Sequence, residues 1–449
     1  MPHNANPAPE ALALHFDLKL NKFWLRVCVL LCLLAGCGWL TLTAASQFVV
    51  RSLADLRVPV SEQALALAVA SFPDSALLNA RLSEAELSAI EDREAAISRA
   101  DLHAARAVAA SPFDYRYRLL QASAREALGD RSGAEAALRE AVRLAPGNTD
   151  VRWRLANLLV RAGKIEAAAT EFQTAVTSQP ERLPGALELI WNVSNGDQKM
   201  VAATAGAEPV TQLALALFLL RKSQPAAAIS TFRQLSRESR LTAQTSSLSA
   251  AFISALMNAG LVDEAWREWR ETLATAPEQM LADGDFEADI PQGFTQFAWQ
   301  IGKSDQARIR VIESAPETVS AHSGRRALRL DFTGRNSTTL TDEIRHPLVV
   351  TPGTTYRVEC FVRTKDLITP EGPRLAVTTG QSVVAESAPI ADGSSDWQKL
   401  SFDFTAPAGV RLLHLTVRRQ PKFGYDDPTR GAIWFDDFSI SVTRSHAVN

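Results

Sequence analysis

Histidine, serine and acidic side chains could carry catalysis in this chain, but none of them stands in a catalytic spacing. The seven histidines are scattered, with no pair four residues apart and no HExxH metal-binding motif. Neither GxSxG nor GxGxxG occurs. Gly302-Lys303-Ser304 imitates the end of a phosphate-binding loop, but Phe297 stands where that loop needs a glycine. The 50 acidic residues offer no reason to choose a pair for glycoside hydrolysis, so we predict that the chain is not an enzyme.

Charge and cysteine usage further narrow the classes of protein to which this chain could belong. A formal net charge of −3, with no block of five basic residues, gives no support for nucleic-acid binding. Three of the four cysteines fall in one apolar stretch near the N-terminus, which leaves Cys360 alone in the rest of the chain. We therefore expect neither a disulfide framework nor a cysteine metal site. At 449 residues, the length predicts about three parts.

A 34-residue period in the middle of the chain predicts paired helices that stack into a solenoid. The echoed positions are Gly129, Ala134, Ala141 and Pro146, followed by Gly163, Ala168, Ala175 and Pro180. Glycine allows the turn between two helices, alanine lets helix backbones approach, and proline ends the second helix. This pattern resembles the tetratricopeptide repeat family. We expect five or six such hairpins over 60–278, with a break near 191–196.

The resemblance implies that the first helix of each repeat lines a groove that binds protein partners. Arg116 falls at one such position. Trp153, Asn157 and Arg161 follow one another at four-residue spacing and so share one helix face. An aromatic ring, an amide and a guanidinium could together hold an extended peptide. The alternative is that Trp153 packs against the neighbouring repeat and the polar side chains face water.

An uncharged run over residues 27–46 contains six leucines and predicts a membrane-spanning helix. Twenty residues at a rise of 1.5 Å cover the ~30 Å hydrocarbon layer. Three basic residues precede the run, a weak bias that favours an N-terminus inside the cell. We predict a cytoplasmic tail over 1–22 and a signal anchor over 23–50. The protein would then pass the cell membrane once, with its bulk outside the cytoplasm.

Two other readings of this run stay open. Leu34-Ala35-Gly36-Cys37 resembles the lipobox of bacterial lipoproteins, in which Cys37 would carry the lipid. The run continues in apolar residues past Cys37, which favours the anchor. An ordinary signal peptidase could instead cut after Ala44-Ala45-Ser46. In all three interpretations the bulk of the chain is exported from the cytoplasm.

After Pro277 the helical period gives way to two-residue alternation of apolar and polar residues. Tyr356, Val358, Cys360 and Val362 share one face of a predicted strand. Turn signals such as Glu371-Gly372-Pro373 and Pro407-Ala408-Gly409 separate such runs. Strand after strand without a helix predicts an all-β antiparallel sandwich over 279–443, followed by a short tail over 444–449.

Several landmarks of this region resemble the jelly-roll carbohydrate-binding modules related to families 4, 9 and 22. They are, in order, Asp283-Gly284-Asp285-Phe286-Glu287, Gly293-Phe294, Trp299, His322-Ser323-Gly324, Pro352-Gly353, Trp397 and Trp434-Phe435-Asp436-Asp437-Phe438. The resemblance implies a fold of this kind and polysaccharide as a partner. Sandwiches of this type also serve protein contacts alone, so fold does not decide the partner.

Sugar recognition needs flat apolar faces beside groups that bind hydroxyls. The stretch 418–431 offers Phe423 and Tyr425 beside Arg418, in a setting rich in proline, glycine and aspartate that favours the surface. Trp299 is a second candidate for sugar contact. We expect Trp397 and Trp434 in the core, because they lie in alternating strands.

The resemblance also implies a structural calcium ion that joins the opening and closing segments of the sandwich. Asp285, Glu287, Asp436 and Asp437 would supply the hard oxygen ligands that calcium prefers. The alternative is that these acids are ordinary turn and strand-edge residues in water. An ion at this place would clamp the domain and perform no chemistry.

These observations together predict a non-enzymatic, membrane-anchored binding protein of the bacterial cell envelope. The repeats would bind protein partners and the sandwich polysaccharide, with a role in making or exporting an exopolysaccharide or O-antigen. A pure assembly scaffold, whose sandwich binds no sugar, is the alternative. A degenerate polysaccharide-active enzyme comes third.

Overall fold

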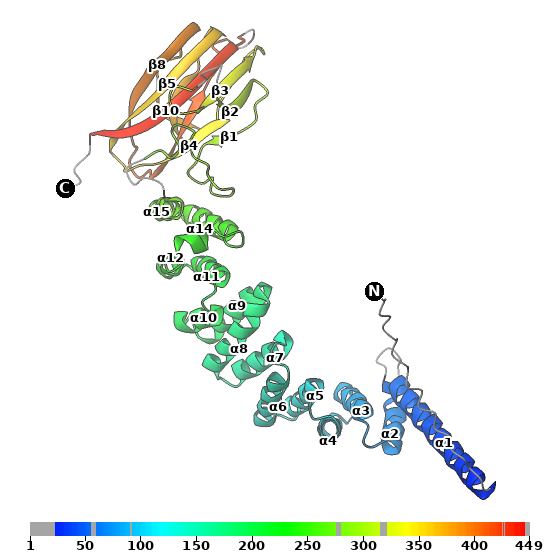
Figure 1. Cartoon of the computed structure of the whole chain (residues 1–449). Coiled ribbons are helices and arrows are strands. Elements are labelled where there is room, and N and C mark those ends of the chain that lie inside the picture. The colour runs from blue at the N-terminus through cyan, green and yellow to red at the C-terminus, as the bar shows by residue number, and fades with distance from the viewer. Residues whose placement is uncertain are drawn as a thin grey trace, which may run out of the picture. The chain divides into compact units, whose positions relative to one another are not determined.

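The computed structural model describes residues 23–54, 60–89, 92–274, 280–314, 321–423, 425 and 427–444 (Figure 1). The chain forms two compact units, Met1–Glu171 and Phe172–Asn449. The predicted cytoplasmic tail, 1–22, lies outside the described residues, as do residues 445–449 of the predicted C-terminal tail.

Helices make up the first unit. They are α1 (Phe23–Ala54), α2 (Glu62–Ser71), α3 (Ala76–Ser88), α4 (Arg93–Ala110), α5 (Tyr115–Ala127), α6 (Arg131–Leu144), α7 (Thr149–Arg161) and α8 (Ile165–Ser178), the last of which continues into the second unit. Side-chain oxygens accept hydrogen bonds from the first backbone N–H groups of several helices, as Ser61 does for α2 and Asn148 for α7. These caps explain why the helices begin where they do.

Within the described residues, one helix is long and apolar enough to cross a membrane. It covers Trp24–Ser52 of α1, with a mean hydropathy of 2.2. Near its C-terminal end, Val50 is buried against Leu65 of α2 and Leu78 of α3. The apolar run thus forms a continuous helix whose last turns join the first helices of the array.

The residues that repeat after 34 positions have the structural roles that their types predict. Gly129 follows α5 and Gly163 follows α7, both with left-handed backbone at φ +80° and +74°. The four echoed alanines have no exposed surface; they are Ala134, Ala141, Ala168 and Ala175. A larger side chain at these positions would push the helices apart. The predicted helical repeats are confirmed.

The second unit begins with further helices. They are η1 (Pro180–Arg182), α9 (Leu183–Val193), α10 (Gln198–Ala205), α11 (Pro209–Arg221), α12 (Pro225–Arg233), α13 (Arg237–Arg240), α14 (Ser246–Asn258) and α15 (Val262–Leu273). Among them α9 packs on α10, α11 on α12, and α14 on α15. Only eight residues form α10, and this short helix follows the stretch 191–196, where the sequence departs from the repeat pattern.

After these helices, the described part of the second unit contains ten strands. They are β1 (Gln300–Ile301), β2 (Ala307–Glu313), β3 (Arg326–Thr333), β4 (Ile344–Val349), β5 (Thr355–Ile368), β6 (Arg374–Thr379), β7 (Ser382–Glu386), β8 (Gly393–Thr405), β9 (Leu412–Arg418) and β10 (Arg430–Arg444). Sheet A has the order β1-β4-β9-β6-β7 and sheet B the order β2-β3-β10-β5-β8, with antiparallel pairing (Figure 1). The predicted all-β sandwich is confirmed.

Alternating side chains of the two sheets fill the sandwich core. Leu328, Val358 and Cys360 of sheet B and Leu413 and Leu415 of sheet A have no exposed surface. Residues between them along each strand therefore face outward, because successive side chains point to opposite faces.

The segment that precedes β1 closes against β10. The backbone N–H of Phe438 donates a hydrogen bond of 2.8 Å to the carbonyl of Gly284. A Cβ atom at position 284 would lie 2.0 Å from the Phe438 carbonyl oxygen, so only glycine allows this approach. The beginning and end of the sandwich are thus joined by backbone contact.

Helices α14 and α15 pack on the same segment. The fully buried Trp269 of α15 donates its indole N–H to the Phe294 carbonyl over 3.0 Å, and its ring packs on Phe297 with centroids 5.9 Å apart. Gln296 donates to the Ala250 carbonyl of α14 over 3.0 Å. The last helical hairpin is therefore fixed to the segment that leads into the sandwich.

We predict that Trp269→Phe weakens this packing by about 1–3 kcal/mol, because it leaves the buried Phe294 carbonyl without a donor. The control is Trp266→Phe, since Trp266 stacks on Trp269 at 5.5 Å and keeps an aromatic ring after the change. Hydrogen exchange of α14 and α15 measures the effect. Equal loss of protection in both variants would contradict a role for the hydrogen bond.

Candidate functional site

The segment between β9 and β10 carries the two aromatic side chains that were predicted to contact sugar. Phe423 is 54% exposed and Tyr425 is 84% exposed. Asp426, which stands beside them in the sequence, lies outside the described residues. Two flat apolar rings are thus presented to solvent by one short loop.

A cleft of about 480 Å³ lies beside this loop. It is lined by Glu371, Gly372, Arg374, Gln381, Val383, Glu386, Arg418, Arg419, Gln420, Pro421 and Lys422. Arg418, the predicted polar partner of the two aromatics, is one of them, and it stands opposite Arg374 in the pairing of β9 with β6. Arg374 forms ion pairs with Glu371 at 2.6 Å and with Glu386 at 3.3 Å. The cleft therefore offers charged donors and acceptors together.

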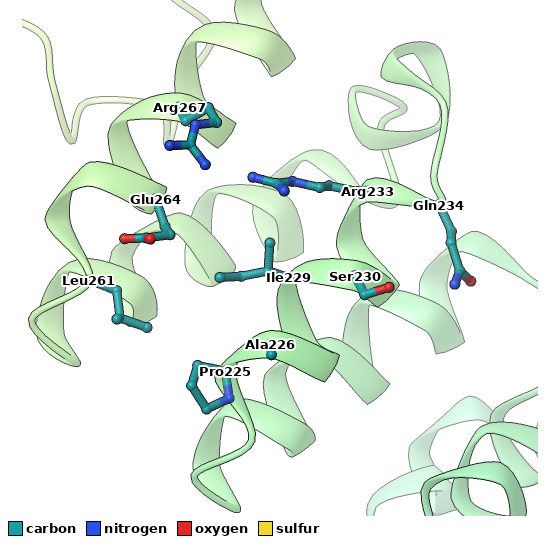
Figure 2. A pocket seen from close by; sticks show the side chains of 9 residues that line it. All are labelled: Pro225, Ala226, Ile229, Ser230, Arg233, Gln234, Leu261, Glu264 and Arg267. Carbon is teal, nitrogen blue, oxygen red and sulfur yellow. The ribbon is translucent and has the colours of Figure 1, made fainter.

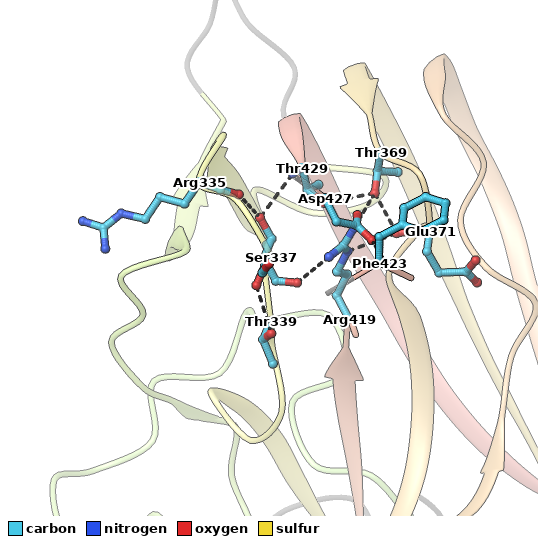
Figure 3. A network of polar contacts seen from close by, with 10 residues as sticks. Arg335, Ser337, Thr339, Thr369, Glu371, Arg419, Phe423, Asp427 and Thr429 are labelled. Atoms are coloured by element: carbon cyan, nitrogen blue, oxygen red, sulfur yellow. Dashed lines mark hydrogen bonds and ion pairs between the residues drawn. The ribbon is translucent and has the colours of Figure 1, made fainter. Parts of the chain in front are cut away.

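A buried ion pair holds the loop in place (Figure 3). Arg419 and Asp427 are bonded to each other, and both side chains have no exposed surface. The Arg419 guanidinium also donates to the carbonyl of Thr338 at 2.5 Å and to that of Glu371 at 3.2 Å. The second carboxylate oxygen of Asp427 accepts the backbone N–H of Phe423 at 2.8 Å. The position of the Phe423 backbone is thereby tied to the sandwich.

The charge state of this pair follows from its partners. Burial alone would raise the pKa of Asp427, but the backbone N–H of Phe423 and the Arg419 guanidinium bring that pKa below its ordinary value. Asp427 is therefore ionised at neutral pH, and its negative charge meets the buried guanidinium.

Trp299 does not join these residues. Its indole N–H donates to the Asp283 carbonyl at 3.0 Å, and its ring packs on Phe286 and Phe438 with centroid distances of 5.3 and 4.7 Å. It lines a different hollow of about 750 Å³, together with Arg326. Its sugar contact stays a prediction, and the cleft beside Phe423 does not depend on it.

Three of the four predicted calcium ligands, Glu287, Asp436 and Asp437, contact the turn that precedes β3. Glu287 accepts the backbone N–H groups of Arg325 and Arg326 at 2.5 and 2.6 Å. The fully buried Asp436 accepts the N–H groups of His322 and Ser323 at 2.7 and 3.1 Å. These carboxylates already have donors in place, so their oxygens join the opening segment, the turn and β10 directly.

The other two acids lie at the same end of the sandwich. Asp437 contacts the ring Nδ1 of His322 at 2.5 Å, and it lines a hollow of about 500 Å³ together with Asp285. Burial raises the pKa of Asp436 to about 6, against its backbone donors. Among the described residues, no three acidic, histidine or cysteine groups come close enough together to hold a metal ion. Calcium stays a prediction.

The predicted partner-binding residues lie on the first helices of two successive repeats, α5 and α7. Arg116 forms an ion pair with the aspartate that caps α5. Trp153 is half-buried, and its carbonyl accepts the side-chain amide of Asn157 at 2.8 Å. Arg161 reaches across to Glu126 of α5. Trp153, Asn157 and Arg161 thus lie on one helix as predicted, and whether they bind a partner stays a prediction.

A hollow in the helical part lies between the second helices of two hairpins, α12 and α15 (Figure 2). It measures about 610 Å³ and is lined by Pro225, Ala226, Ile229, Ser230, Arg233, Gln234, Leu261, Glu264 and Arg267. Arg233 forms an ion pair of 2.6 Å with the buried Glu268, so its guanidinium is held at the rim. The spacing pattern directed attention to first helices and missed this surface.

Comparison with known proteins gives one family match, in the helical part of the chain. Residues 126–189 match the family model "Tetratricopeptide repeat". A comparison with curated proteins finds no match. Among solved structures, "Crystal structure of MamA" is 13% identical, covers 38% of this chain and 83% of that one, and has a TM-score of 0.27. A thermophilic tetratricopeptide protein of Thermus thermophilus, TTC0263, is 22% identical, covers 30% and 70%, and scores 0.25.

The sandwich has its own neighbours. The structure of TmCBM61 with β-1,4-galactotriose is 16% identical, covers 37% of this chain and 99% of that one, and has a TM-score of 0.25. A family 4 module, "CBM4 structure and function", is 14% identical, covers 36% and 99%, and scores 0.26. These scores carry no functional argument. The chain has a tetratricopeptide-like helical array, matched by the family model over residues 126–189, and a C-terminal sandwich of two antiparallel sheets.

Proposed function

We propose that this protein is a non-catalytic binding scaffold, whose helical repeats hold protein partners and whose sandwich binds polysaccharide in the cleft beside Phe423 and Tyr425. One observation carries the proposal for the sandwich. Phe423 and Tyr425 are exposed between β9 and β10, and the buried pair of Arg419 with Asp427 fixes the backbone of Phe423, next to Lys422 of a polar cleft.

The chemistry of the cleft suits a sugar chain. The rings of Phe423 and Tyr425 offer flat apolar faces for the C–H groups of a sugar ring. Arg374, Gln381 and Glu386 line the cleft with donors and acceptors that suit hydroxyl groups. Because the loop is already fixed, little conformational entropy would be lost on binding.

The helical array supplies surfaces for protein partners. The first helices present Trp153, Asn157 and Arg161, and the hollow between α12 and α15 adds an apolar floor with Ile229 beside charged side chains (Figure 2). Repeats of this kind stack into extended binding surfaces. We infer that one protein partner is held here while the sandwich remains available to a glycan.

We propose that the N-terminal helix tethers these activities to a membrane, which its length and apolar composition support. In this proposal α1 crosses the cell membrane once, residues 1–22 lie in the cytoplasm, and the remainder lies outside it in a bacterial envelope. A tethered protein that joins a partner to a polysaccharide fits a role in making or exporting an exopolysaccharide or O-antigen.

We further propose that calcium binds near Glu287, Asp436 and Asp437. These acids, with Asp285, gather at the end of the sandwich where its opening segment, the turn before β3 and β10 meet. Buried Asp436 would gain most from a cation, since burial disfavours its negative charge.

Replacing both Phe423 and Tyr425 by alanine should weaken retention on immobilised polysaccharide about tenfold or more, because both ring contacts are lost. The melting temperature should stay unchanged, since both rings are exposed. Affinity electrophoresis against a panel of polysaccharides measures the retention. Phe113→Ala, which removes an 83% exposed ring from the helical part, is the control. Undiminished retention would place the glycan elsewhere, or show that the sandwich binds none.

Replacing Asp427 by alanine should destabilise the sandwich by about 3–5 kcal/mol, because it leaves the Arg419 charge buried and unpaired. The matched control is Asp403→Ala, since Asp403 pairs with Arg357 at an exposed site of the same sandwich. That control should cost less than about 1 kcal/mol. Urea unfolding followed by hydrogen exchange of β9 and β10 measures both.

The contribution of the Arg419–Asp427 pair to stability depends on pH, and the sign of this dependence follows from the pKa of Asp427. Because the pKa of Asp427 is lowered in the folded state, its contribution is present above the ordinary carboxyl pKa near 3.9 and is lost as pH falls through the lower, folded value. Acid unfolding of the native protein should therefore be steeper than that of Asp427→Asn. If Asp427→Ala and Asp403→Ala lower the free energy of unfolding equally, the buried pair is not what holds the loop.

Adding calcium to the chelator-treated full chain should raise the melting temperature of the sandwich, because binding at a hundredfold excess over Kd would add about 2.7 kcal/mol to the free energy of unfolding. Differential scanning calorimetry measures the shift. Asp436→Asn should abolish it, whereas Asp403→Asn should leave it unchanged. If neither calcium nor chelator changes the melting temperature, these acids bind no calcium and act only as hydrogen-bond acceptors.

A further inference from the structure

The sandwich is open at the side where β1 and β2 form the edges of its two sheets. In the described part of the chain, β1 pairs only with β4 in sheet A, and β2 only with β3 in sheet B (Figure 1). Val311 of β2 stands opposite the fully buried Leu328, so its side chain points towards the interior. It is nevertheless 39% exposed, and Ile301 of β1 is 36% exposed. The apolar core is therefore incomplete at this side.

A hollow of about 750 Å³ lies beside these two side chains. Its apolar lining is made of Phe286, Ile290, Pro291, Ala298, Trp299, Ile301 and Val311. Its charged members already have partners. Arg326 forms an ion pair of 2.9 Å with Asp289, and Asp283 accepts the Ala288 backbone N–H at 2.8 Å. The hollow therefore gives apolar side chains a place in which they can be buried.

The backbone of β2 bonds to β3 through every second residue. Near one end the Gln306 carbonyl accepts the Thr333 N–H at 3.1 Å, and near the other end the Ser314 N–H donates to the Arg325 carbonyl at 2.6 Å. Because this bonding alternates along an antiparallel strand, the even-numbered residues between these ends also bond to β3. The odd-numbered residues direct their N–H and C=O groups to the free edge.

Ile309 and Val311 are the central odd-numbered residues of β2. Among the described residues, no group forms a hydrogen bond with their backbone N–H or C=O at the free edge. Their side chains face the interior, where Ile309 packs on the core and Val311 lines the hollow. An unpaired strand edge, which is a template for another strand, thus lies beside an unfilled apolar space.

We propose that an extended segment of a protein partner adds to β2 as a further strand of sheet B. Its backbone pairs with Ile309 and Val311, and its apolar side chains, which alternate along a strand, enter the hollow. Main-chain pairing supplies the affinity, and the apolar hollow supplies the selectivity. This surface goes beyond the proposed function, in which the helical repeats hold the protein partner and the sandwich binds a glycan.

A second copy of this chain fits the edge less well than a different segment. In an antiparallel pair of two β2 strands, the odd-numbered residues would have to bond to each other. Arg310 would then stand opposite the same arginine of the second copy, and a two-residue shift towards the start of the strand would bring it opposite Arg308. Like charges in these positions destabilise a strand pair.

Arg308 favours an acidic residue in the partner segment. Its guanidinium has no partner among the described residues. Asp331 stands opposite it in β3, but this carboxylate is bonded to Arg329 at 2.8 Å and to Arg310 at 3.1 Å. An acidic side chain on the added strand can lie beside Arg308 on the outer face. The partner segment therefore alternates apolar residues with polar ones, at least one of them acidic.

The test uses the full chain in detergent and a synthetic peptide that alternates valine with threonine and glutamate. We expect the peptide to slow hydrogen exchange of β2, because the free N–H groups of Ile309 and Val311 gain acceptors. A matched peptide with methylated backbone nitrogens cannot donate to β2 and should bind about tenfold more weakly or worse. Fluorescence anisotropy of the labelled peptides measures their affinity.

Val311→Pro should weaken peptide binding about tenfold or more, because it removes an edge N–H that β3 does not use. The matched control is Ser401→Pro on β8, the opposite edge strand of sheet B. There the Ala406 N–H donates to the Thr354 carbonyl at 3.0 Å, so the alternation directs the Ser401 N–H away from β5. This control should change peptide binding less than about twofold.

Failure of this inference is distinct from failure of the cleft. Phe423→Ala with Tyr425→Ala should leave peptide binding intact, and Val311→Pro should leave glycan retention intact. Val311→Lys keeps the N–H, places a charge at the hollow and guards against a folding defect caused by proline; it should weaken peptide binding as well. Equal losses with Val311→Pro and Ser401→Pro would overturn the proposal, as would equally tight binding of the methylated peptide. Protection of β2 that rises with protein concentration in the absence of peptide would identify a second copy as the occupant and overturn it too.

Discussion

Antiparallel pairing of β5 with β10 decides which side chains of the sandwich face its core and which face solvent. These are its two longest strands, and they lie next to each other in sheet B. On β10, Ile433 and Phe435 enter the core while Trp434 between them turns outward. A register shift follows Asp436, and Asp437 there has a left-handed backbone at φ +50°. This bulge lets β10 reach the opening segment through Phe438, so a slip of one residue would lose the core and the closure together.

The loop with Phe423 and Tyr425 depends on a different constraint, the burial of two charges. Removing an arginine and an aspartate from water costs several kcal/mol for each ion, and their attraction offsets this only when the remaining donors and acceptors are satisfied. Here the Arg419 guanidinium reaches two backbone carbonyls, and Asp427 accepts the Phe423 backbone N–H. The pair therefore contributes a fixed loop geometry more than it contributes net stability. In the proposed function, this geometry would hold Phe423 in place before a glycan binds.

The sequence period and the residue types predicted the helices and strands, because local rules decide where these elements form. The 34-residue spacing of small residues requires close helix packing, and two-residue alternation requires a strand with one buried face. Exposure of Phe423 and Tyr425 also followed from their setting. The cleft partner Arg374 could not be found in this way, since it reaches Arg418 only through the order of strands in sheet A. The sequence predicts Trp434 in the core, and this is wrong: Ile433 and Phe435 on either side enter the core, so Trp434 turns outward and arginine side chains bury it.

The proposed glycan cleft and the proposed strand-binding edge belong to different sheets of the sandwich. Packed sheets lie about 10 Å apart, so a path through solvent from one outer face to the other is longer than the Debye length of about 8 Å at physiological salt. Arg308 at the edge of sheet B therefore adds little to attraction at the cleft, where Arg374 is already paired with two glutamates. The residues that line the cleft and the hollow are different, so a glycan and a peptide strand would not compete for contacts. Avidity for a partner that carries both then depends on the length between its two bound segments.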